Sequence, residues 1–281
     1  MTDHVDKLID LALTEDIGSG DVTSEYFVPA DVQAKAMMLV KADGVVAGLE
    51  IAQFVFQKVD ASIKTKILMP DGSRVKKGDY IMEITGPARS VLTGERVALN
   101  FMQRLSGIAT KTAMFVDLIE GTKANVLDTR KTTPGWRELE KYAVTQGGGM
   151  NHRMGLYDRA MVKDNHLVAE HDVDDIQTAI LKLKNEKPNV EVELEADLLD
   201  QVAAFLKLEG VDHILLDNMT NEQMSEAVKM RGNKSVPKLE ASGGVNESTI
   251  AGIAKTGVDF ISVGALTHSA VALDISLDFI D

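Results

Sequence analysis

Residues 213–265 read HILLDNMTNEQMSEAVKMRGNKSVPKLEASGGVNESTIAGIAKTGVDFISVGA, in which three short β-rich runs alternate with longer polar segments. Its β-rich runs are His213–Asn218, Lys238–Ser242 and Phe260–Ala265. The residues between them predict helices over Asn221–Met230 and Glu247–Thr256. Strands that alternate with helices of this length indicate a parallel β/α architecture.

The same alternation continues towards the N-terminus. Further β-rich runs lie at Ala124–Thr129, Arg159–Lys163 and Val190–Leu194, and a helical stretch lies at Asp197–Leu208. In β/α barrels the active site forms at the carboxyl ends of the strands, and glycines after the last strands commonly bind phosphate. Polar residues and glycines occupy these ends throughout: Asp128, Arg130, Lys163, Asp164, Glu193, Glu195, Asp217, Asn218, Ser242, Gly243, Gly244 and Gly264.

The first part of the chain has a different pattern. Residues 5–12 carry apolar side chains at the spacing of an amphipathic helix, and residues 63–87 alternate between strand and turn composition, which predicts a β-meander. The meander is similar to half of a biotinyl or lipoyl carrier domain, but its Lys76-Lys77 pair lies beside a glycine turn rather than at a hairpin tip. Residues that favour turns are enough to explain the meander pattern without a carrier function. Residues 88–120 predict a long helical region that breaks at Ser106-Gly107.

Composition excludes several classes of protein. The formal net charge of −13 argues against a nucleic-acid-binding face. The absence of cysteine excludes disulfides, thiolate metal sites and a cysteine nucleophile. The N-terminus lacks the basic start of a signal peptide, and no apolar run approaches the roughly 18 residues of a spanning helix. We therefore expect a soluble cytoplasmic protein that contacts neither nucleic acid nor membrane.

Residues 130–163 form a positive island in this acidic chain. They contain seven lysines and arginines against three acidic residues, which predicts a pocket for a polyanionic small molecule. Not every cation is expected to serve it. Thr133-Pro134 predicts the start of a helix that runs to Thr145, with Arg137 and Lys141 as solvated charges interleaved with Glu138 and Glu140. Trp136, Leu139, Tyr142 and Ala143 would be its buried face.

The remaining cations of the island are better candidates for a site. Arg130 and Lys131 lie between a predicted strand end and a helix start, and Arg153 follows His152 behind a triple glycine. Lys163 ends an apolar run, where it is either an anion clamp or a Schiff-base nucleophile. Two acids, Glu193 and Asp217, follow on later strands. They either hold magnesium together with substrate phosphates or pair with nearby cations.

Long motifs in a fixed order carry a family resemblance. DTRKTTPG, GGGMNHRMGL, KDNH, VEVE, LLDN, ASGGV and TGVDFISVGALTHS, preceded by GDVTSE and GERVALNFMQRLSGIAT, resemble the quinolinate phosphoribosyltransferases over essentially the whole chain. The resemblance implies an α/β fold of two domains. Residues 1–110 would form an α/β sandwich to which residues 266–281 return, and residues 111–265 would form an open, seven-stranded α/β barrel.

The resemblance also implies a reaction. Quinolinate and 5-phosphoribosyl-1-diphosphate would give nicotinate mononucleotide, carbon dioxide and diphosphate, with Mg²⁺ and no organic cofactor. The chain would work as a homodimer or hexamer in which Arg96 completes the site of a neighbouring subunit. The alternatives are a related enzyme of molybdate transport operons that acts on another ring acid, a Schiff-base aldolase and a carrier module.

Site roles follow from the resemblance position by position. Catalytic roles are implied for Lys131, Lys163, Glu193 and Asp217, and metal binding for Glu193 and Asp217. Substrate binding is implied for a larger set: Arg96, Thr129, Arg130, Lys131, His152, Arg153, Lys163, Glu193, Asp217, Ser242, Gly243, Gly244, Val263, Gly264 and Ala265.

Overall fold

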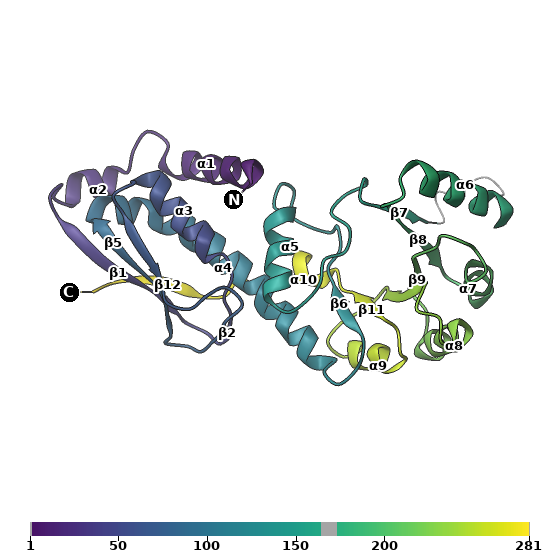
Figure 1. Ribbon diagram of the computed structural model, residues 1–281. Coiled ribbons are helices and arrows are strands. Elements are labelled where there is room, and N and C mark those ends of the chain that lie inside the picture. Colours follow the sequence, from purple (N-terminus) through teal and green to yellow (C-terminus); the bar gives the residue numbers. More distant parts are fainter. Residues whose placement is uncertain (1, 164–172, 281) are drawn as a thin grey trace. The chain divides into compact units, whose positions relative to one another are not determined.

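The computed structural model describes residues 2–163 and 173–280, and the chain divides into two compact units (Figure 1). The first unit comprises Met1–Ala113, Thr132–Gly148 and Ser269–Asp281, and the second comprises Met114–Lys131 and Gly149–His268. Within the described residues, no helix combines the length and apolar character needed to cross a membrane.

The first unit is built on a four-stranded antiparallel sheet in the order β12-β1-β5-β3. These strands are Ile275–Ile280, Gln33–Val40, Tyr80–Pro87 and Lys64–Ile67. A smaller pair joins β2 (Gly44–Val45) to β4 (Arg74–Val75). Its helices are α1 (Asp3–Ile17), α2 (Val22–Phe27), α3 (Leu49–Val59) and α5 (Arg137–Gln146), together with α4 (Ala88–Leu118) as far as Ala113.

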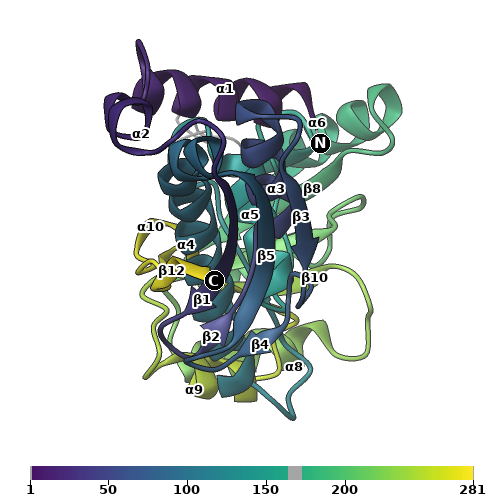
Figure 2. The same cartoon turned by 90° about the vertical axis from the view of Figure 1, so that its left-hand side faces the viewer.

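The larger sheet has one buried face. Ala36, Met38 and Val40 alternate along β1 with more exposed residues, and Met82 and Ile84 of β5 are equally buried. Because side chains alternate across a strand, this pattern gives one apolar face for the helices to cover. Figure 2 shows the sheet in front of α3 and α4.

The long helix α4 is continuous, so the break expected at Ser106-Gly107 is wrong. Gly107 permits a close approach rather than a bend. A Cβ atom at this position would lie 2.1 Å from the backbone oxygen of Val271, which no side chain tolerates. Ser106 accepts a hydrogen bond from the N–H of Ala47 over 3.0 Å. Both small residues therefore serve packing against neighbouring segments.

Helix α5 differs from expectation in its charges. It begins at Arg137, later than predicted, and Glu140 and Lys141 are buried, with 0% and 1% of their surfaces exposed. Arg137 is half-buried and donates from Nε to Thr132 Oγ1 over 3.0 Å. The prediction of solvated charges is therefore wrong here. Tyr142, predicted to be buried, is exposed.

A paired partner explains how Glu140 is buried. Its Oε1 accepts hydrogen bonds from Arg104 Nη2 over 2.7 Å and from Thr133 Oγ1 over 2.8 Å, and its Oε2 accepts from the Thr133 N–H over 3.1 Å. A buried carboxylate is stable only when it is paired in this way. Nearby, the ring of Trp136 stacks on Phe101 with centroids 4.8 Å apart.

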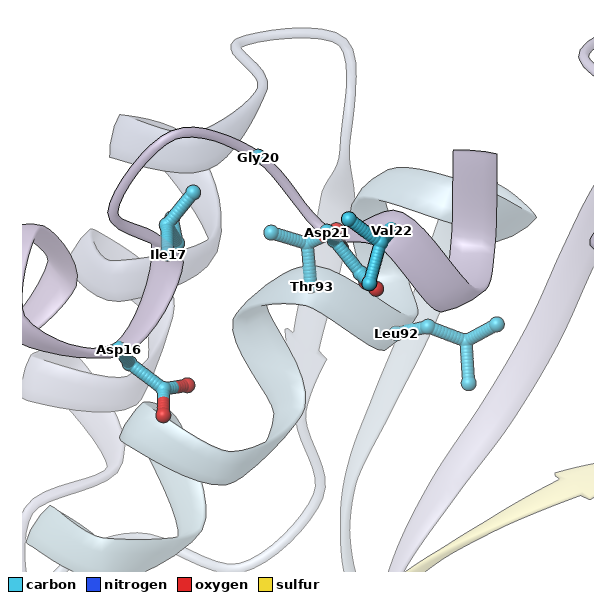
Figure 3. Close-up of a pocket in the computed structure, with 7 residues that line it drawn as sticks. All are labelled: Asp16, Ile17, Gly20, Asp21, Val22, Leu92 and Thr93. Atoms are coloured by element: carbon cyan, nitrogen blue, oxygen red, sulfur yellow. Dashed lines mark hydrogen bonds between the residues drawn. The ribbon is translucent and has the colours of Figure 1, made fainter. Parts of the chain in front are cut away.

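The GDVTSE motif has a structural explanation in the first unit. The Asp21 carboxylate caps α2 by accepting from the Ser24 N–H over 3.0 Å, and it also accepts from Thr93 Oγ1 of α4 over 3.0 Å. These bonds hold the loop beside a small cavity of about 290 Å³, which Asp16, Ile17 and Leu92 also line (Figure 3).

The second unit is built on a parallel sheet in the order β6-β11-β10-β9-β8-β7. Its strands are Asn125–Leu127, Phe260–Ser262, Lys238–Ser242, His213–Asp217, Glu191–Ala196 and Arg159–Val162. All six were predicted, and the α/β architecture is confirmed. Within the described residues the sheet has six strands, with β6 and β7 at its two edges; the seventh strand that the resemblance implies is not among them.

Helices α6 to α9 lie outside this curved sheet (Figure 1). They are Val173–Glu186, Leu199–Phe205, Asn221–Arg231 and Ile250–Lys255, and a short α10 spans Ala265–His268. Thr220 caps α8 by accepting from the Gln223 N–H, while the Gln223 side chain accepts from the Thr220 N–H. Such reciprocal capping fixes where the helix begins after β9.

Candidate active site

A cavity of about 750 Å³ opens at the carboxyl ends of the strands of the second unit. Its position agrees with the general rule for parallel α/β folds. The lining residues come from the strands, from the loops that follow them, from the loop before β7 and from α10: Thr129, Arg130, Lys131, His152, Arg153, Met161, Lys163, Leu215, Asp217, Asn218, Glu240, Ser242, Gly243, Gly244, Val245, Ser262, Gly264, Ala265 and His268.

Four cationic side chains meet at this cavity. Arg130 and Lys131 follow β6, Arg153 lies in the loop before β7, and Lys163 follows β7. Burial, and then the nearby charge of Arg130, lower the pKa of Arg153. Cations held close enough to repel one another favour an anion between them. The fold thus concentrates part of the positive island into one concave surface.

Two glycine turns allow backbone to approach the cavity closely. Gly243, after β10, has a φ of 91°, and a Cβ atom there would lie 2.1 Å from Asn218 Oδ1. Gly264, after β11, faces Lys131 and His268, each 3.2 Å from where its Cβ would be. Both turns therefore need glycine, because neighbouring side chains fill the space that a Cβ atom would occupy, and both glycines line the cavity.

Lys163 has an acidic partner. Its Nζ forms an ion pair with Oε2 of Glu195, which follows Glu193 on the same face of β8. The pair holds Nζ in the cavity lining, where it presents a positive charge. This arrangement fits an anion clamp better than a Schiff-base lysine.

The two candidate metal ligands lie at different depths. Asp217 is the last residue of β9 and pairs in register with Ser242 at the cavity, where its Oδ2 accepts from Asn218 Nδ2 over 2.7 Å. Glu193 is the third residue of β8, not its end, and pairs in register with His213. Four residues along a strand correspond to about 13 Å. Joint ligation of one Mg²⁺, with ligands at about 2.1 Å, does not fit this register.

Glu193 instead belongs to a buried triad with His152 and Glu240. The Nε2 atom of His152 lies 3.1 Å from Glu193 Oε2 and 3.5 Å from Glu240 Oε1, and both carboxylates have 0% of their surface exposed. Ligand atoms of the three lie within 4.8 Å of one another, a donor set that divalent transition metals accept.

Opposing effects act on the His152 ring. Burial lowers its pKa, but the carboxylates of Glu193 and Glu240 beside Nε2 outweigh burial and raise the pKa of His152 to about 9. The Arg153 N–H donates to Nδ1 over 2.7 Å and favours the neutral ring. The Nδ1 atom that accepts this hydrogen bond carries no proton, so in this geometry the ring proton lies on Nε2, towards the two carboxylates. Asp128, also buried, accepts from the His152 N–H over 2.9 Å and fixes the loop.

Sequence reasoning missed Glu240. The signal was present, because Lys238, Glu240 and Ser242 alternate along β10 and therefore share one face of the strand. In a barrel this is the interior face. A carboxylate at the centre of that face has to be buried against other strands.

Some predicted residues lie away from the cavity lining. Val263 is buried beside it, with 1% exposed. Arg96 belongs to α4 in the first unit, where 58% of its side chain is exposed and Nη2 lies 3.8 Å from Glu95 Oε1. The predicted Asp164 falls outside the described residues.

Comparison with protein families covers both parts of the chain. Residues 21–106 match the N-terminal domain of quinolinate phosphoribosyl transferase, and residues 108–278 match its C-terminal domain. The chain belongs to the quinolinate phosphoribosyltransferase family. Members of this family are phosphoribosyltransferases of NAD biosynthesis, and the resemblance seen in the sequence is confirmed.

Individual relatives agree with this membership of the quinolinate phosphoribosyltransferase family. The nicotinate-nucleotide pyrophosphorylase [carboxylating] of Mycobacterium leprae is 42% identical over 95% of this chain and 94% of its own length. A chloroplastic enzyme of the same name from Arabidopsis thaliana is 42% identical, over 96% of this chain and 81% of its own. The structure of the Francisella tularensis nicotinate-nucleotide pyrophosphorylase superposes with a TM-score of 0.93 at 39% identity, over 99% and 96% of the two chains.

Proposed function

We propose that this chain transfers the phosphoribosyl group of 5-phosphoribosyl-1-diphosphate to quinolinate, with loss of carbon dioxide, to give nicotinate mononucleotide and diphosphate. One observation carries the proposal. In a chain with a net charge of −13, four cations and two glycine turns converge on a single cavity at the carboxyl edge of a parallel sheet.

The charges of the two substrates fit the lining of this cavity. Quinolinate carries two carboxylates, for which Arg130 and Arg153 offer planar donors and Lys163 a third positive charge. The phosphates of the co-substrate fit the turns at Ser242–Gly244 and Val263–Ala265, where backbone approaches the cavity. Lys131 lies against Gly264 and is placed to offset the charge of the departing diphosphate.

The chemistry requires stabilisation of charge rather than a nucleophilic side chain. The pyridine nitrogen of quinolinate attacks C1 of the ribose while the C1–O bond to diphosphate breaks, so positive charge develops on the sugar. Asp217, at the cavity wall, is suited to stabilise that charge, and Glu193 acts from beneath through His152. The positive ring nitrogen then stabilises the electron pair left on C2 when the 2-carboxylate departs as carbon dioxide, and C2 takes up a proton from water. Positioning and electrostatics supply the rate enhancement.

Magnesium is proposed as a companion of the diphosphate. Mg²⁺ usually keeps several waters and binds one or two carboxylates together with substrate phosphates, whose charge it neutralises. Asp217 fits as such a single carboxylate because it lines the cavity. The triad of His152, Glu193 and Glu240 offers an imidazole and is buried, which suits magnesium poorly.

The assembly is also a proposal. Arg96 is largely exposed and belongs to the first unit, outside the cavity lining, so it fits a role in the site of a neighbouring copy. We propose a homodimer or a hexamer built from such dimers, working in the cytoplasm. A mixture of two inactive variants, Arg96→Ala and Lys163→Ala, should regain activity if each site draws on two chains. Failure to regain it would overturn the shared site.

The central experiment is an assay of the purified protein with Mg²⁺, quinolinate and 5-phosphoribosyl-1-diphosphate. We expect nicotinate mononucleotide and diphosphate in equal amounts. The monocarboxylate nicotinate should compete weakly, because it lacks one of the two groups that the cations bind. No product above background would overturn the proposal, and turnover of another ring acid in preference to quinolinate would point to a related transferase.

A further inference from the structure

Asn218 has an unusual backbone conformation at the edge of the cavity. It follows Asp217, the last residue of β9, and its φ of 51° lies in the left-handed region. In the part of the chain that the structure describes, no other residue with a side chain has a positive φ. Glycine adopts this conformation at no steric cost, and asparagine adopts it more readily than most other residues. The presence of asparagine instead of glycine points to a use for the side chain.

The backbone on both sides of Asn218 is held in place. Its N–H donates to the carbonyl oxygen of Ser242 over 2.9 Å, which continues the pairing of β9 with β10 beyond the last residue of β9. Met219, the next residue, is buried, and Thr220 then caps α8. Because its neighbours are fixed in this way, the backbone sets the direction of the Asn218 side chain at the cavity lining.

The side chain of Asn218 contacts the Asp217 carboxylate. Its Nδ2 atom donates to Asp217 Oδ2 over 2.7 Å, a length typical of a hydrogen bond to a charged acceptor. In the free protein this bond is open to water, because Asn218 is exposed and Asp217 is half-buried. A ligand that fills the cavity would exclude that water, and the bond would then hold the carboxylate more strongly.

The same side chain fills the space beside Gly243. The three atoms nearest to a Cβ atom at Gly243 would all belong to Asn218: Oδ1 at 2.1 Å, Cγ at 2.6 Å and N at 2.9 Å. Glycine at position 243 therefore leaves room for the Asn218 side chain. This contact connects the LLDN motif, which ends at Asn218, with the ASGGV motif, which contains Gly243.

We propose that Asn218 is a positioning residue that holds the Asp217 carboxylate at a fixed place relative to the glycine turn after β10. The inference rests on the proposed function, in which Asp217 stabilises positive charge on the ribose and the turn at Ser242–Gly244 receives a phosphate of the same co-substrate. Because the ribose and its phosphates are covalently joined, the carboxylate and the turn have to act at a fixed separation. Asn218 contacts both of them.

Asn218→Gly tests this role without disturbing the backbone. Glycine accepts a φ of 51°, so the melting temperature should stay near that of the wild type. Loss of a hydrogen bond to a charged group should lower kcat about tenfold. The KM for quinolinate should not change, because Arg130, Arg153 and Lys163 bind that substrate in the proposed function. Asn233→Gly, the same change on an exposed turn after α8, should leave kcat and KM unchanged.

The kinetic result separates positioning from a purely conformational role. If Asn218 served only to turn the backbone, glycine would serve equally well. A wild-type kcat in Asn218→Gly would therefore overturn the proposal. A loss confined to the KM for quinolinate would overturn it too, because Asn218 would then act on the substrate that the cations bind.

A second measurement needs no substrate. In crystals of Asn218→Gly, the Asp217 side chain should occupy more than one conformation while the backbone at Gly243 stays in place. In crystals of the wild type and of Asn233→Gly, it should occupy one conformation. A single, unchanged conformation of Asp217 in Asn218→Gly would contradict the proposal. If the wild type forms no nicotinate mononucleotide, the proposed function fails, and the crystals still decide whether Asn218 positions Asp217.

Discussion

Replacing Arg104 by methionine tests how the first unit holds a buried charge. The guanidinium donates to Glu140 Oε1 from Nη2 over 2.7 Å and from Nε over 3.3 Å, and Glu140 has none of its surface exposed. The variant keeps most of the side-chain volume but removes the cation. An uncompensated buried carboxylate should cost about 3–5 kcal/mol of the free energy of unfolding. Urea titration at neutral pH measures this loss.

Two further variants make the result interpretable. Arg104→Met/Glu140→Leu removes both partners, so most of the loss should return, leaving about 1–3 kcal/mol for the unsatisfied Thr133 N–H. Lys7→Met breaks an ion pair of similar length, 2.6 Å to Asp3, at an exposed position, and should cost less than about 1 kcal/mol. A loss of less than about 1 kcal/mol in Arg104→Met, or a double variant no more stable than the single one, would refute the reasoning.

Three other predictions concern the site and the packing. Arg153→Ala should raise the KM for quinolinate at least about tenfold, because a charge-assisted hydrogen bond is lost, and its circular dichroism should show an intact fold. Lys229→Ala, which removes an exposed cation, should not change the KM. The pKa of His152 is raised from 6.5 to about 9, so protonation of this ring adds about 3 kcal/mol to the free energy of unfolding. This contribution is complete below pH 6.5 and is lost as the pH rises to about 9. The difference in unfolding free energy between wild type and His152→Asn should shrink over that window, and a constant difference would contradict it. Gly107→Ala should lower the free energy of unfolding by more than about 2 kcal/mol, because its Cβ would meet a backbone oxygen. Asn100→Ala, on an exposed turn of the same helix, should not destabilise the protein in thermal unfolding.

The parallel sheet was predictable because its signal is local. Apolar runs such as HILL and FIS are bounded by turn and helix residues, and every predicted strand of the second unit lies within two residues of the observed one at its first residue. The strand ends also identified most of the cavity lining. A rule about which edge of a parallel sheet binds ligands was enough to group Arg130, Lys163 and Asp217.

Depth and long-range pairing were not predictable in the same way. The register between β8 and β9 decides that Glu193 lies level with His213 rather than at the cavity rim, and a single sequence does not contain that register. The burial of Glu140 depends on Arg104, which lies on another helix. Gly107 resembled a helix breaker because the segment that packs against it, at Val271, is far along the chain.

The pairing of β12 with β1 has a consequence for the order of folding during synthesis. Strand β1 lies inside its sheet, and one of its two edges pairs with β12, which follows the whole of the second unit in sequence. Until β12 has left the ribosome, β1 presents unpaired N–H and C=O groups to any extended chain nearby. The second unit has all of its strands before that moment. We therefore expect the parallel sheet of the second unit to be completed first during synthesis. The antiparallel sheet of the first unit would be completed only when β12 pairs with β1, and a chaperone could protect β1 until then.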